Sequence, residues 1–473
     1  MLHCEKLTAE ALEFAGLNHE TLNGTVLATI INRKVLDVKR LRPRGERTVP
    51  LYSLAQALAD GAGRNFILEC KQSSPTLGDF CHDFNLDRLI EVYSTRAAAI
   101  SVLCEEHFFK GSLSFLRYVK ERCSLPVICK DFIICEEQLE TAFIAGADAV
   151  LLMLSVLSED LFLRLYQKAS DLGLEVLCEV SDEKEAEFAI GHKIPVVGIN
   201  NRDLKTLKID LNNARKLYPL FDGKTVVISE SGICEHSDLV SLKPIRNFLI
   251  GSSLTGSDDL VFKANSLLYG MNKVCGITTE DALLSLIRNH VSIAGLIFVE
   301  KSPRCVDQAQ AAKLIGLAGH AIRFAGVFVD ESIDRMEVIA ARLGLDYLQL
   351  HGHESLETIK TLKRDLPKVQ IIKALNAELF RDEKTVRAYQ EAADLLLLDS
   401  SAPGSGRSFD WSEISAAVDK GRTLLSGGIG PDNLTKALSL GFAGLDLNSK
   451  LEKEKGIKDP HLIDEAFCII NRF

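Results

Sequence analysis

Short apolar runs rich in Val, Ile and Leu recur along the chain, with amphipathic stretches between them. Each run has the length and the β-branched content of a buried strand. In the first half the runs are FILEC at 66, AISVLC at 99, PVICKDF at 126, AVLLML at 149, EVLCEV at 175, VVGIN at 196, TVVISESG at 225 and NFLIGSS at 247. The stretches at 135–147 and 159–173 have apolar residues at helical spacing and a closing glycine. Eight strand-then-helix units are what a (β/α)8 barrel requires.

The same pattern then starts again. The second set of runs is NKVCGI at 272, AGLIFV at 294, FAGVFV at 324, YLQLHG at 347, QIIKAL at 370, LLLLDS at 395, TLLSGGI at 423 and GLDLNS at 444. Alternating units are also compatible with a doubly wound open sheet, but two consecutive sets of eight favour closed barrels. We therefore predict an α/β protein made of two consecutive (β/α)8 TIM barrels.

The length of 473 residues agrees with two domains, because single cores stop growing near roughly 250 to 300 residues. We expect an N-terminal extension at 1–24, a first barrel with extra N-terminal helices at 25–270 and a second barrel at 271–473, with almost no linker. The segment 27–41 reads as an amphipathic helix. It could cover a barrel mouth or plug a barrel bottom, and the sequence does not choose between the two.

Composition narrows the class of protein. The chain is 47% hydrophobic and 25% charged, as in ordinary globular proteins. Its net charge of -10 argues against a nucleic-acid-binding surface spread over the whole protein, but is compatible with a local basic pocket. No apolar run approaches the ~18 residues of a membrane span, and the N-terminus lacks the pattern of a signal peptide. We expect a cytoplasmic protein whose twelve cysteines, which form no CxxC pair, are mostly reduced and buried.

Polar residues stand where the predicted strands of the first half end, which is where such barrels place their chemistry. They are Glu69, Lys71, Glu105, Lys130, Asp131, Ser155, Glu179, Asn200, Asn201, Arg202, Glu230, Ser231 and Ser252. The simpler interpretation is a salt-bridge network that closes the barrel top. So many charges in one cavity are costly to desolvate without a task, so we favour acid and base work on an anionic substrate.

The ends of the seventh and eighth strands predict a phosphate site. Ser231 with Gly232, and Gly251 with Ser252, match the usual cradle of backbone N–H groups in these barrels. Tight turns are the alternative explanation for the same residues.

The first half resembles indole-3-glycerol-phosphate synthase along its whole length. The resemblance is carried by ILECKQSSP (67–75), CKDFII (129–134), LLMLSVL (151–157), EVLCEVS (175–181), VVGINNRDL (196–204), VISESGI (227–233) and FLIGSSL (248–254). That family closes the indole ring of carboxyphenylaminodeoxyribulose phosphate with loss of carbon dioxide and water. The resemblance therefore implies a synthase activity for the first barrel.

The resemblance also implies residue roles. Lys130 resembles the general acid that protonates the carbonyl oxygen at the condensing carbon, and Glu179 resembles the base. Lys71 would pair with the anthranilate carboxylate and also help in the dehydration, so the division of acid steps between the two lysines stays open. The positioning residues are Glu69, Asn200 and Glu230, and the phosphate-binding positions are matched by Ser74, Gly232 and Ser252, while Arg202 follows Asn200 in the family's order.

The second half resembles phosphoribosylanthranilate isomerase, again along its whole length. The matching motifs are NKVCGIT (272–278), KSPRCV (301–306), AGVFV (325–329), LQLHG (348–352), IIKAL (371–375), LLLDS (396–400), GSGRSFDW (404–411), LSGGI (425–429), PDN (431–433) and GLDLNS (444–449). This family performs an Amadori rearrangement, which needs an acid to open the furanose ring and a base to take the C2 proton. Asp399 resembles that acid and Cys275 that base.

Further residues of the isomerase site follow from the same resemblance. Arg304 would hold the anthranilate carboxylate through a bidentate fork. Gly428 and Ser449 belong to the phosphate end, and His351 and Asp446 would line the pocket. A lone cysteine is more often buried packing, but the flanking KVCGIT motif and Asp399 favour a base, provided that a strand end or a nearby positive charge lowers its pKa.

Lys450 is a departure from the pattern. It follows Ser449 where the isomerase family has a small residue. Its side chain could crowd the phosphate or neutralise it.

Two other functions compete with this interpretation. One barrel could be inactive and serve as a binding or scaffolding domain, although a decayed site should have lost some of the proposed groups. Alternatively, both barrels could act on other phosphosugars, as a histidine-pathway isomerase or a Schiff-base aldolase; borohydride trapping would expose the latter. We expect small phosphorylated substrates as the only partners, neither nucleic acid nor membrane, a monomer, and no metal or organic cofactor.

Overall fold

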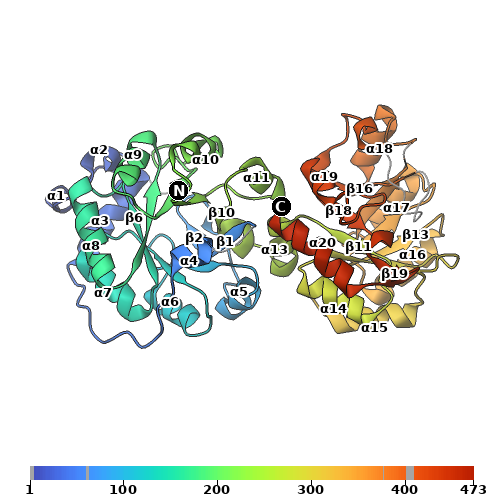
Figure 1. The fold of residues 1–473 in the computed structure, drawn as a ribbon, viewed down its shortest axis with the longest axis horizontal. Helices are drawn as coiled ribbons and strands as arrows, with labels where there is room; N and C mark the ends of the chain where they lie inside the picture. Colours follow the sequence, from blue (N-terminus) through green and yellow to red (C-terminus); the bar gives the residue numbers. More distant parts are fainter. Residues whose placement is uncertain (1–4, 60–62, 377, 401–409) are drawn as a thin grey trace. The chain divides into compact units, whose positions relative to one another are not determined.

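The computed structural model describes residues 5–59, 63–376, 378–400 and 410–473 (Figure 1). Contacts divide the chain into two compact units, Met1–Cys234 with Ser241–Leu260, and Glu235–Val240 with Val261–Phe473. Each unit contains one closed barrel of eight parallel strands. The prediction of two consecutive TIM barrels is confirmed.

The strands of the first barrel coincide with the apolar runs of the first half. They are β1 (Asn65–Cys70), β4 (Ala99–Leu103), β5 (Val127–Lys130), β6 (Ala149–Met153), β7 (Glu175–Val180), β8 (Val196–Asn200), β9 (Val226–Glu230) and β10 (Asn247–Ile250). Each strand pairs in parallel with the next, and β10 closes on β1 through pairs such as Ile67 with Leu249. Nearly every strand residue is buried, because helices cover a parallel barrel from outside.

Helices follow the strands of the first barrel. They are α5 (Leu86–Tyr93), α6 (Leu113–Lys120), α7 (Glu136–Ala145), α8 (Glu159–Asp171), α9 (Glu183–Gly191), α10 (Asn212–Leu217), η1 (Tyr218–Leu220) and α12 (Ser252–Thr255). Helices α11 (His236–Ser241) and α13 (Leu260–Tyr269) also occur in this part of the chain, but nearly all of their residues belong to the second unit. The short strands β2 (Ser73–Ser74) and β3 (Gly78–Asp79) form a separate hairpin. Helix α8 shows why the boundaries fall where they do: Ser158 caps its first turn, and Gly173, at φ +77°, follows its end.

Four helices precede the first barrel strand. They are α1 (Ala9–Leu12), α2 (His19–Leu22), α3 (Val26–Val38) and α4 (Leu54–Ala59). The buried Asn32 of α3 accepts a hydrogen bond from the Thr8 backbone and donates one to the Lys6 carbonyl, which ties the preceding segment to α3. Val26, Leu27 and Ile30 of α3 line the same cavity as residues at the carboxyl ends of the strands. The helix therefore covers the mouth of the barrel rather than its bottom.

The second barrel repeats the plan. Its strands are β11 (Lys273–Cys275), β12 (Ile293–Ile297), β13 (Arg323–Phe328), β14 (Tyr347–Leu350), β15 (Gln370–Leu375), β16 (Leu395–Leu398), β17 (Thr423–Leu425) and β18 (Gly444–Leu447). Its helices are α14 (Glu280–Arg288), α15 (Gln308–Ala318), α16 (Ile333–Leu343), α17 (Leu356–Asp365), α18 (Glu383–Ala392), η2 (Trp411–Glu413), η3 (Lys420–Arg422), α19 (Leu434–Ser439), η4 (Ser449–Leu451) and α20 (Pro460–Arg472). A hairpin of β19 (Glu452–Glu454) and β20 (Ile457–Lys458) lies between η4 and α20.

Helix α13 packs against one end of the second barrel, where its Phe262 contacts the residues inside the barrel. The buried cluster that Phe262 contacts includes Ile293, Tyr347 and Leu395. These are the first residues of strands β12, β14 and β16. The Arg323 guanidinium lies 3.8 Å from the centre of the Phe262 ring. The helix thus covers the amino-terminal end of this barrel, opposite to the end where the strands terminate.

Within the described residues, no helix combines the length and the apolar composition that crossing a membrane requires.

Candidate active sites

A cavity of about 460 Å³ lies at the carboxyl ends of the strands of the first barrel. All twelve residues that the family resemblance and the predicted phosphate cradle assign to this site line it. They are Glu69, Lys71, Ser74, Lys130, Glu179, Asn200, Arg202, Glu230, Ser231, Gly232, Gly251 and Ser252. The strands bring these residues together because parallel strands all end at the same mouth.

Lys130, the last residue of β5, lies among carboxylates. Its Nζ is 2.5 Å from Glu230 Oε2 and 3.7 Å from Glu179 Oε2. Burial alone would lower the pKa of Lys130, but the charges of Glu230, Glu179 and Glu69 outweigh it and raise the pKa. The ammonium is therefore charged before substrate arrives, as a general acid must be.

Glu230 is held in an unusual way. One carboxylate oxygen contacts Lys130, while the buried Oε1 has no hydrogen-bond partner among the residues that the structure describes. Burial raises the pKa of Glu230, and the neighbouring Glu179 and Glu69 add to the effect against the opposing Lys130. The pKa of a carboxyl group in this position depends on the charge of Lys130, so its protonation can change when Lys130 gives up its proton.

Glu69 and Lys71 form a second pair at the end of β1, with Nζ to Oε1 at 2.7 Å. Burial acts to raise the pKa of Glu69, but the charges of Lys71 and Lys130 overcome it and lower the pKa. Glu69 therefore remains an anion between two ammonium groups. The Lys71 side chain is the more exposed partner, so it is the one that can reach a bound anion.

Asn200, the last residue of β8, connects this strand to Glu179 on β7. Its Nδ2 donates to Glu179 Oε1 at 3.0 Å, and its Oδ1 accepts from the Arg202 backbone N–H at 2.9 Å. These bonds orient the Glu179 carboxylate and fix the turn that leads to Arg202. One amide side chain of the NNRD motif thus positions the Glu179 carboxylate and the backbone of Arg202.

The expected phosphate cradle has the backbone that a cradle needs. Ser231 has φ +67° and Gly232 has φ +87°, so two successive residues after β9 adopt the left-handed region. Gly251 directly precedes Ser252, the first residue of α12. Successive backbone N–H groups in such turns make concave anion sites.

Some strand-end residues serve structure instead. Glu105 accepts three backbone N–H bonds, from His107, Phe108 and Phe109, and so clamps its own loop. Asn201 donates to Ser229 Oγ and to two carbonyls. The sequence predicts both at the barrel mouth, but the pattern of residues does not show which way a side chain turns.

The sequence also missed the apolar wall of the cavity. Phe109 and Phe132 line it together with residues of α3 and with Leu151 and Met153. A wall of this kind suits an aromatic ring of a ligand and keeps water away from the charged groups. The only signal in the sequence was the amphipathic pattern of 27–41.

We predict that Gly198→Ala selectively impairs chemistry at this site. An added Cβ would lie 1.8 Å from Glu230 Oε1, so Glu230 would have to move and would carry its contact with Lys130 with it. Misplacing a catalytic group by about 1 Å can cost ~10²-fold in rate, so we expect the kcat of the synthase reaction that the resemblance implies to fall by about that factor. Steady-state assays of the two implied reactions measure this effect, with the reaction of the second barrel as internal reference.

Gly191→Ala is the matched control, because nothing lies within 4 Å of its added methyl group. Normal synthase turnover in Gly198→Ala would contradict the importance of the position of Glu230.

The second barrel has a cavity of about 280 Å³ at the corresponding end. All seven residues that the sequence assigned to the isomerase site line it. They are Cys275, Arg304, His351, Asp399, Gly428, Asp446 and Ser449. Gln349, Ser426 and Asn448 also line it and were not anticipated.

Asp399, which follows β16, contacts His351. Its Oδ2 is 3.2 Å from His351 Nε2, and its Oδ1 accepts from the Ser400 backbone N–H at 2.7 Å. Gln349 Nε2 lies 2.9 Å from His351 Nδ1. The carboxyl group is therefore fixed in orientation by a histidine that is itself fixed by a glutamine.

Cys275 is buried at the end of β11. Burial raises the pKa of its thiol above the ordinary value, against the opposing charges of Lys273 and Lys458. The positive charges that the sequence argument required are present, but the direction of the net shift is upward because burial is the largest effect. A buried thiol depends on such neighbours to act as a base.

Arg304 lies in a charged cluster that the sequence did not reveal. Its Nε and Nη2 bind the two oxygens of Glu452 at 2.7 and 2.9 Å. Glu452 Oε1 also accepts from Lys458 Nζ at 2.7 Å, and Lys458 is fully buried. Glu452 thus occupies one edge of the guanidinium, so a substrate carboxylate would meet the edge that carries Nη1.

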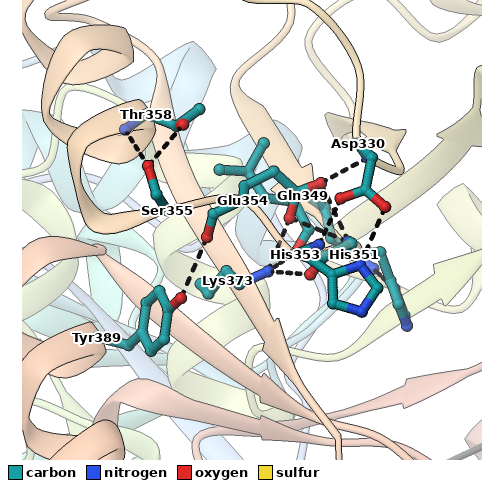
Figure 2. A network of polar contacts seen from close by, with 11 residues as sticks. Asp330, Gln349, His351, His353, Glu354, Ser355, Thr358, Lys373 and Tyr389 are labelled. Atoms are coloured by element: carbon teal, nitrogen blue, oxygen red, sulfur yellow. Dashed lines mark hydrogen bonds and ion pairs between the residues drawn. The ribbon is translucent and has the colours of Figure 1, made fainter.

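The loop that carries His351 is supported by the network shown in Figure 2. Lys373 Nζ donates to Glu354 Oε2 at 2.7 Å and to the Gly352 carbonyl at 2.6 Å. Glu354 Oε1 accepts from the backbone N–H groups of Asp330 and Gly352. Strand β15 thereby holds the loop after β14, and this fixes the position of His351.

We predict that Lys373→Met destabilises the second unit by about 3–5 kcal/mol, because it leaves the buried Glu354 carboxylate without its counter-ion. Urea unfolding followed by the fluorescence of Trp411, the single tryptophan of the chain, reports on this unit.

The matched control for this variant is Lys363→Met. It breaks the half-exposed ion pair with Asp394 and should cost less than about 1 kcal/mol. Equal midpoints for the two variants would rule out a special role for the buried pair.

Lys450 turns toward Asp432, with 3.6 Å between Nζ and Oδ2, and its side chain is well exposed. It is not among the residues that line the cavity. Most of the matching motif at 404–411 lies outside the described residues. Among the described residues, no group of three or more His, Cys, Asp or Glu side chains could hold a metal ion.

Sequence comparison identifies each half separately. A family model described as "Indole-3-glycerol phosphate synthase" matches residues 27–267. A second, described as "N-(5'phosphoribosyl)anthranilate (PRA) isomerase", matches residues 272–468. The two matches follow the two barrels in order.

Curated relatives match across both halves. A protein named "Tryptophan biosynthesis protein TrpCF" from Yersinia pestis is 42% identical over 85% of this chain and 84% of its own. The proteins of the same name from Salmonella typhi and Helicobacter pylori strain 26695 are 40% and 38% identical, each over 95% of this chain and their full length. A crystal structure of phosphoribosyl anthranilate isomerase from Thermus thermophilus is 28% identical, with a TM-score of 0.39, over 42% of this chain and 96% of its own.

Proposed function

Since the chain belongs to the family of bifunctional TrpCF tryptophan-biosynthesis proteins, we propose which of its residues carry each of the two reactions. The second barrel isomerises N-(5'-phosphoribosyl)anthranilate to 1-(2-carboxyphenylamino)-1-deoxyribulose 5-phosphate. The first barrel converts that product to indole-3-glycerol phosphate with loss of carbon dioxide and water. No observation favours the alternative of one inactive barrel kept as a scaffold.

In the first barrel Lys130 is the general acid. Its ammonium protonates the carbonyl oxygen while the aromatic carbon attacks, and Glu230 and Glu179 stabilise its charge until then. Glu179, oriented by Asn200, takes the proton from the ring. Lys71 binds the anthranilate carboxylate and shares in the dehydration, with Glu69 holding its ammonium in place.

The phosphate of this substrate binds at the ends of β9 and β10. The backbone N–H groups of Ser231, Gly232, Gly251 and Ser252 supply donors in the left-handed turns and at the start of α12. Ser74 and Arg202 line the cavity and add a hydroxyl and a positive charge. The apolar wall of Phe109, Phe132 and α3 receives the aromatic ring.

In the second barrel Asp399 is the acid that opens the furanose ring, and His351 orients it. Cys275 is the base that takes the C2 proton. Arg304 binds the anthranilate carboxylate through the guanidinium edge that Glu452 leaves open. Gly428 and Ser449 form the phosphate end of the cavity, and Asp446 completes its lining.

The convergence of all twelve assigned residues on one cavity in the first barrel is the observation that carries the proposal. A network that only closed the barrel top would not need two lysines facing three carboxylates beside an apolar wall. We further propose that the protein works in the cytoplasm as a monomer, without binding nucleic acid.

The experiment that tests the assignments mixes two variants. Purified Cys275→Ala and Lys130→Ala are each given phosphoribosylanthranilate, and its fluorescence and the formation of indole-3-glycerol phosphate are followed. Neither variant alone should complete both steps, whereas their equimolar mixture should, because each supplies the barrel that the other lacks. Completion by a single variant would show that its replaced residue is not required.

A further inference from the structure

Lys273 is a buried charge that the proposed chemistry does not use. It is fully buried, and it lies two residues before Cys275 on β11. Residues i and i+2 of a strand point to the same face, so the ammonium group and the thiol are side by side on the inner face of the barrel. A lysine of this kind carries a large desolvation cost and therefore calls for an explanation.

The neighbouring strands fix the surroundings of both side chains. Asp446 on β18 is the register partner of Lys273, and its two oxygens lie 2.9 and 3.1 Å from Nζ. Gly295 on β12 is the register partner of Cys275. A Cβ at Gly295 would lie 2.9 Å from Cys275 Sγ and 3.1 Å from Lys273 Nζ, so the sulfur and the nitrogen share the space that this glycine leaves.

The charged groups that act on Cys275 are unequal in strength. Lys273 from β11 favours the thiolate most, Asp446 from β18 opposes it, and Lys458 from β20 favours it less. Arg304 also interacts with Cys275, but it and Lys458 are both bound to Glu452. Asp446 in turn interacts with Asp399 and His351 across the cavity. Lys273 is thus the main cation that offsets the burial of the sulfur.

We propose that Lys273 is a positioning residue whose ammonium is the counter-ion of the Cys275 thiolate, which makes Cys275 able to accept the substrate proton. The proposal rests on the proposed role of Cys275 as the isomerase base. In that step the C2 proton passes to Sγ, the C2–H electron pair forms the C1–C2 double bond, and the electrons of the C1–N double bond return to nitrogen. Lys273 keeps its own protons throughout.

The test is the pH dependence of alkylation of Cys275 by iodoacetamide, resolved by peptide mass spectrometry, because only the thiolate reacts. An opposite charge within about 4–6 Å shifts a pKa by about 1–3 units, so we expect the midpoint for Cys275 to rise by that amount in Lys273→Met. The exposed Cys234 and Cys468 serve as internal references in the same sample. The isomerase kcat should fall at neutral pH and recover in part as pH rises.

A second variant supplies a test of sign. Asp446→Asn removes the carboxylate that competes for Lys273, so the Cys275 midpoint should fall. A general disturbance of packing would move both variants in the same direction. Lys363→Met, which removes a lysine of the same barrel that does not line the cavity, is the control and should leave the midpoint unchanged.

An unchanged midpoint in Lys273→Met, or a rise in both Lys273→Met and Asp446→Asn, would overturn the inference. Retention of isomerase activity by Cys275→Ala would instead overturn the role of Cys275 itself. The two failures are therefore distinguishable.

Discussion

Replacing Lys130 with alanine should reduce the synthase kcat by about 10²–10⁴-fold, the usual contribution of a general acid. The variant loses the only ammonium that contacts both Glu230 and Glu179 in the described structure, and no other donor there takes its place at the end of β5. The isomerase should keep its normal rate, because its residues belong to the other unit. Steady-state assay of each reaction with its own substrate measures both effects.

The matched control is Lys168→Ala, which removes a lysine from the partly exposed ion pair with Glu140 on the outside of the same barrel. Such pairs contribute little, so its synthase activity should equal that of the unchanged protein. If Lys130→Ala behaved like this control, Lys71 would have to carry the acid steps alone.

Replacing Cys275 with alanine should lower the isomerase kcat by a comparable factor of about 10²–10⁴, because the substrate loses its proton acceptor. Cys275→Ser separates chemistry from packing, since serine is close to cysteine in size but is a far weaker acid. Both variants should show this loss of isomerase activity and should be normal as synthases when the isomerised substrate is supplied. Loss of the fluorescence of phosphoribosylanthranilate measures the first reaction.

Cys468→Ala is the matched control for the cysteine variants, because this exposed residue on α20 lies away from the cavity lining. It should isomerise at the unchanged rate. Recovery of activity in Cys275→Ser but not in Cys275→Ala would assign Cys275 to packing.

The sequence predicted the barrels and the charged strand-end residues of the first cavity for one reason. A buried strand is read as an apolar run, and the polar residue that follows it must lie at the mouth. Lys130, Asn200 and Glu230 are each the last residue of a strand in the structure. Their convergence therefore follows from topology alone, without knowledge of any side-chain contact.

The partners of Arg304 in the second barrel could not be predicted in the same way. The segment that contains Glu452 and Lys458 is rich in charge and reads as an exposed loop, yet both side chains are almost completely buried. Their burial is possible because the Glu452 carboxylate accepts hydrogen bonds from both Lys458 and Arg304. Contacts between a hairpin and a distant loop leave no periodic signal in the chain.

The direction of the Cys275 pKa shift could not be predicted from the sequence either. The residue types predict a nearby positive charge, and Lys273 supplies one. The effect of burial on the same thiol depends on the packing of strands far apart in the chain, so residue types alone do not predict which effect is larger. Glu105 illustrates the same limit, since only the structure shows that its carboxylate binds its own loop.

Helix α13 has a practical consequence for anyone who wishes to separate the two enzymes. The isomerase family match begins at residue 272, but the contacts of the second unit include everything from Val261 onward. A truncated protein that started at residue 272 would lack Phe262 and would expose to water the apolar floor that this ring covers. An excised isomerase should therefore aggregate unless the preceding helix is retained.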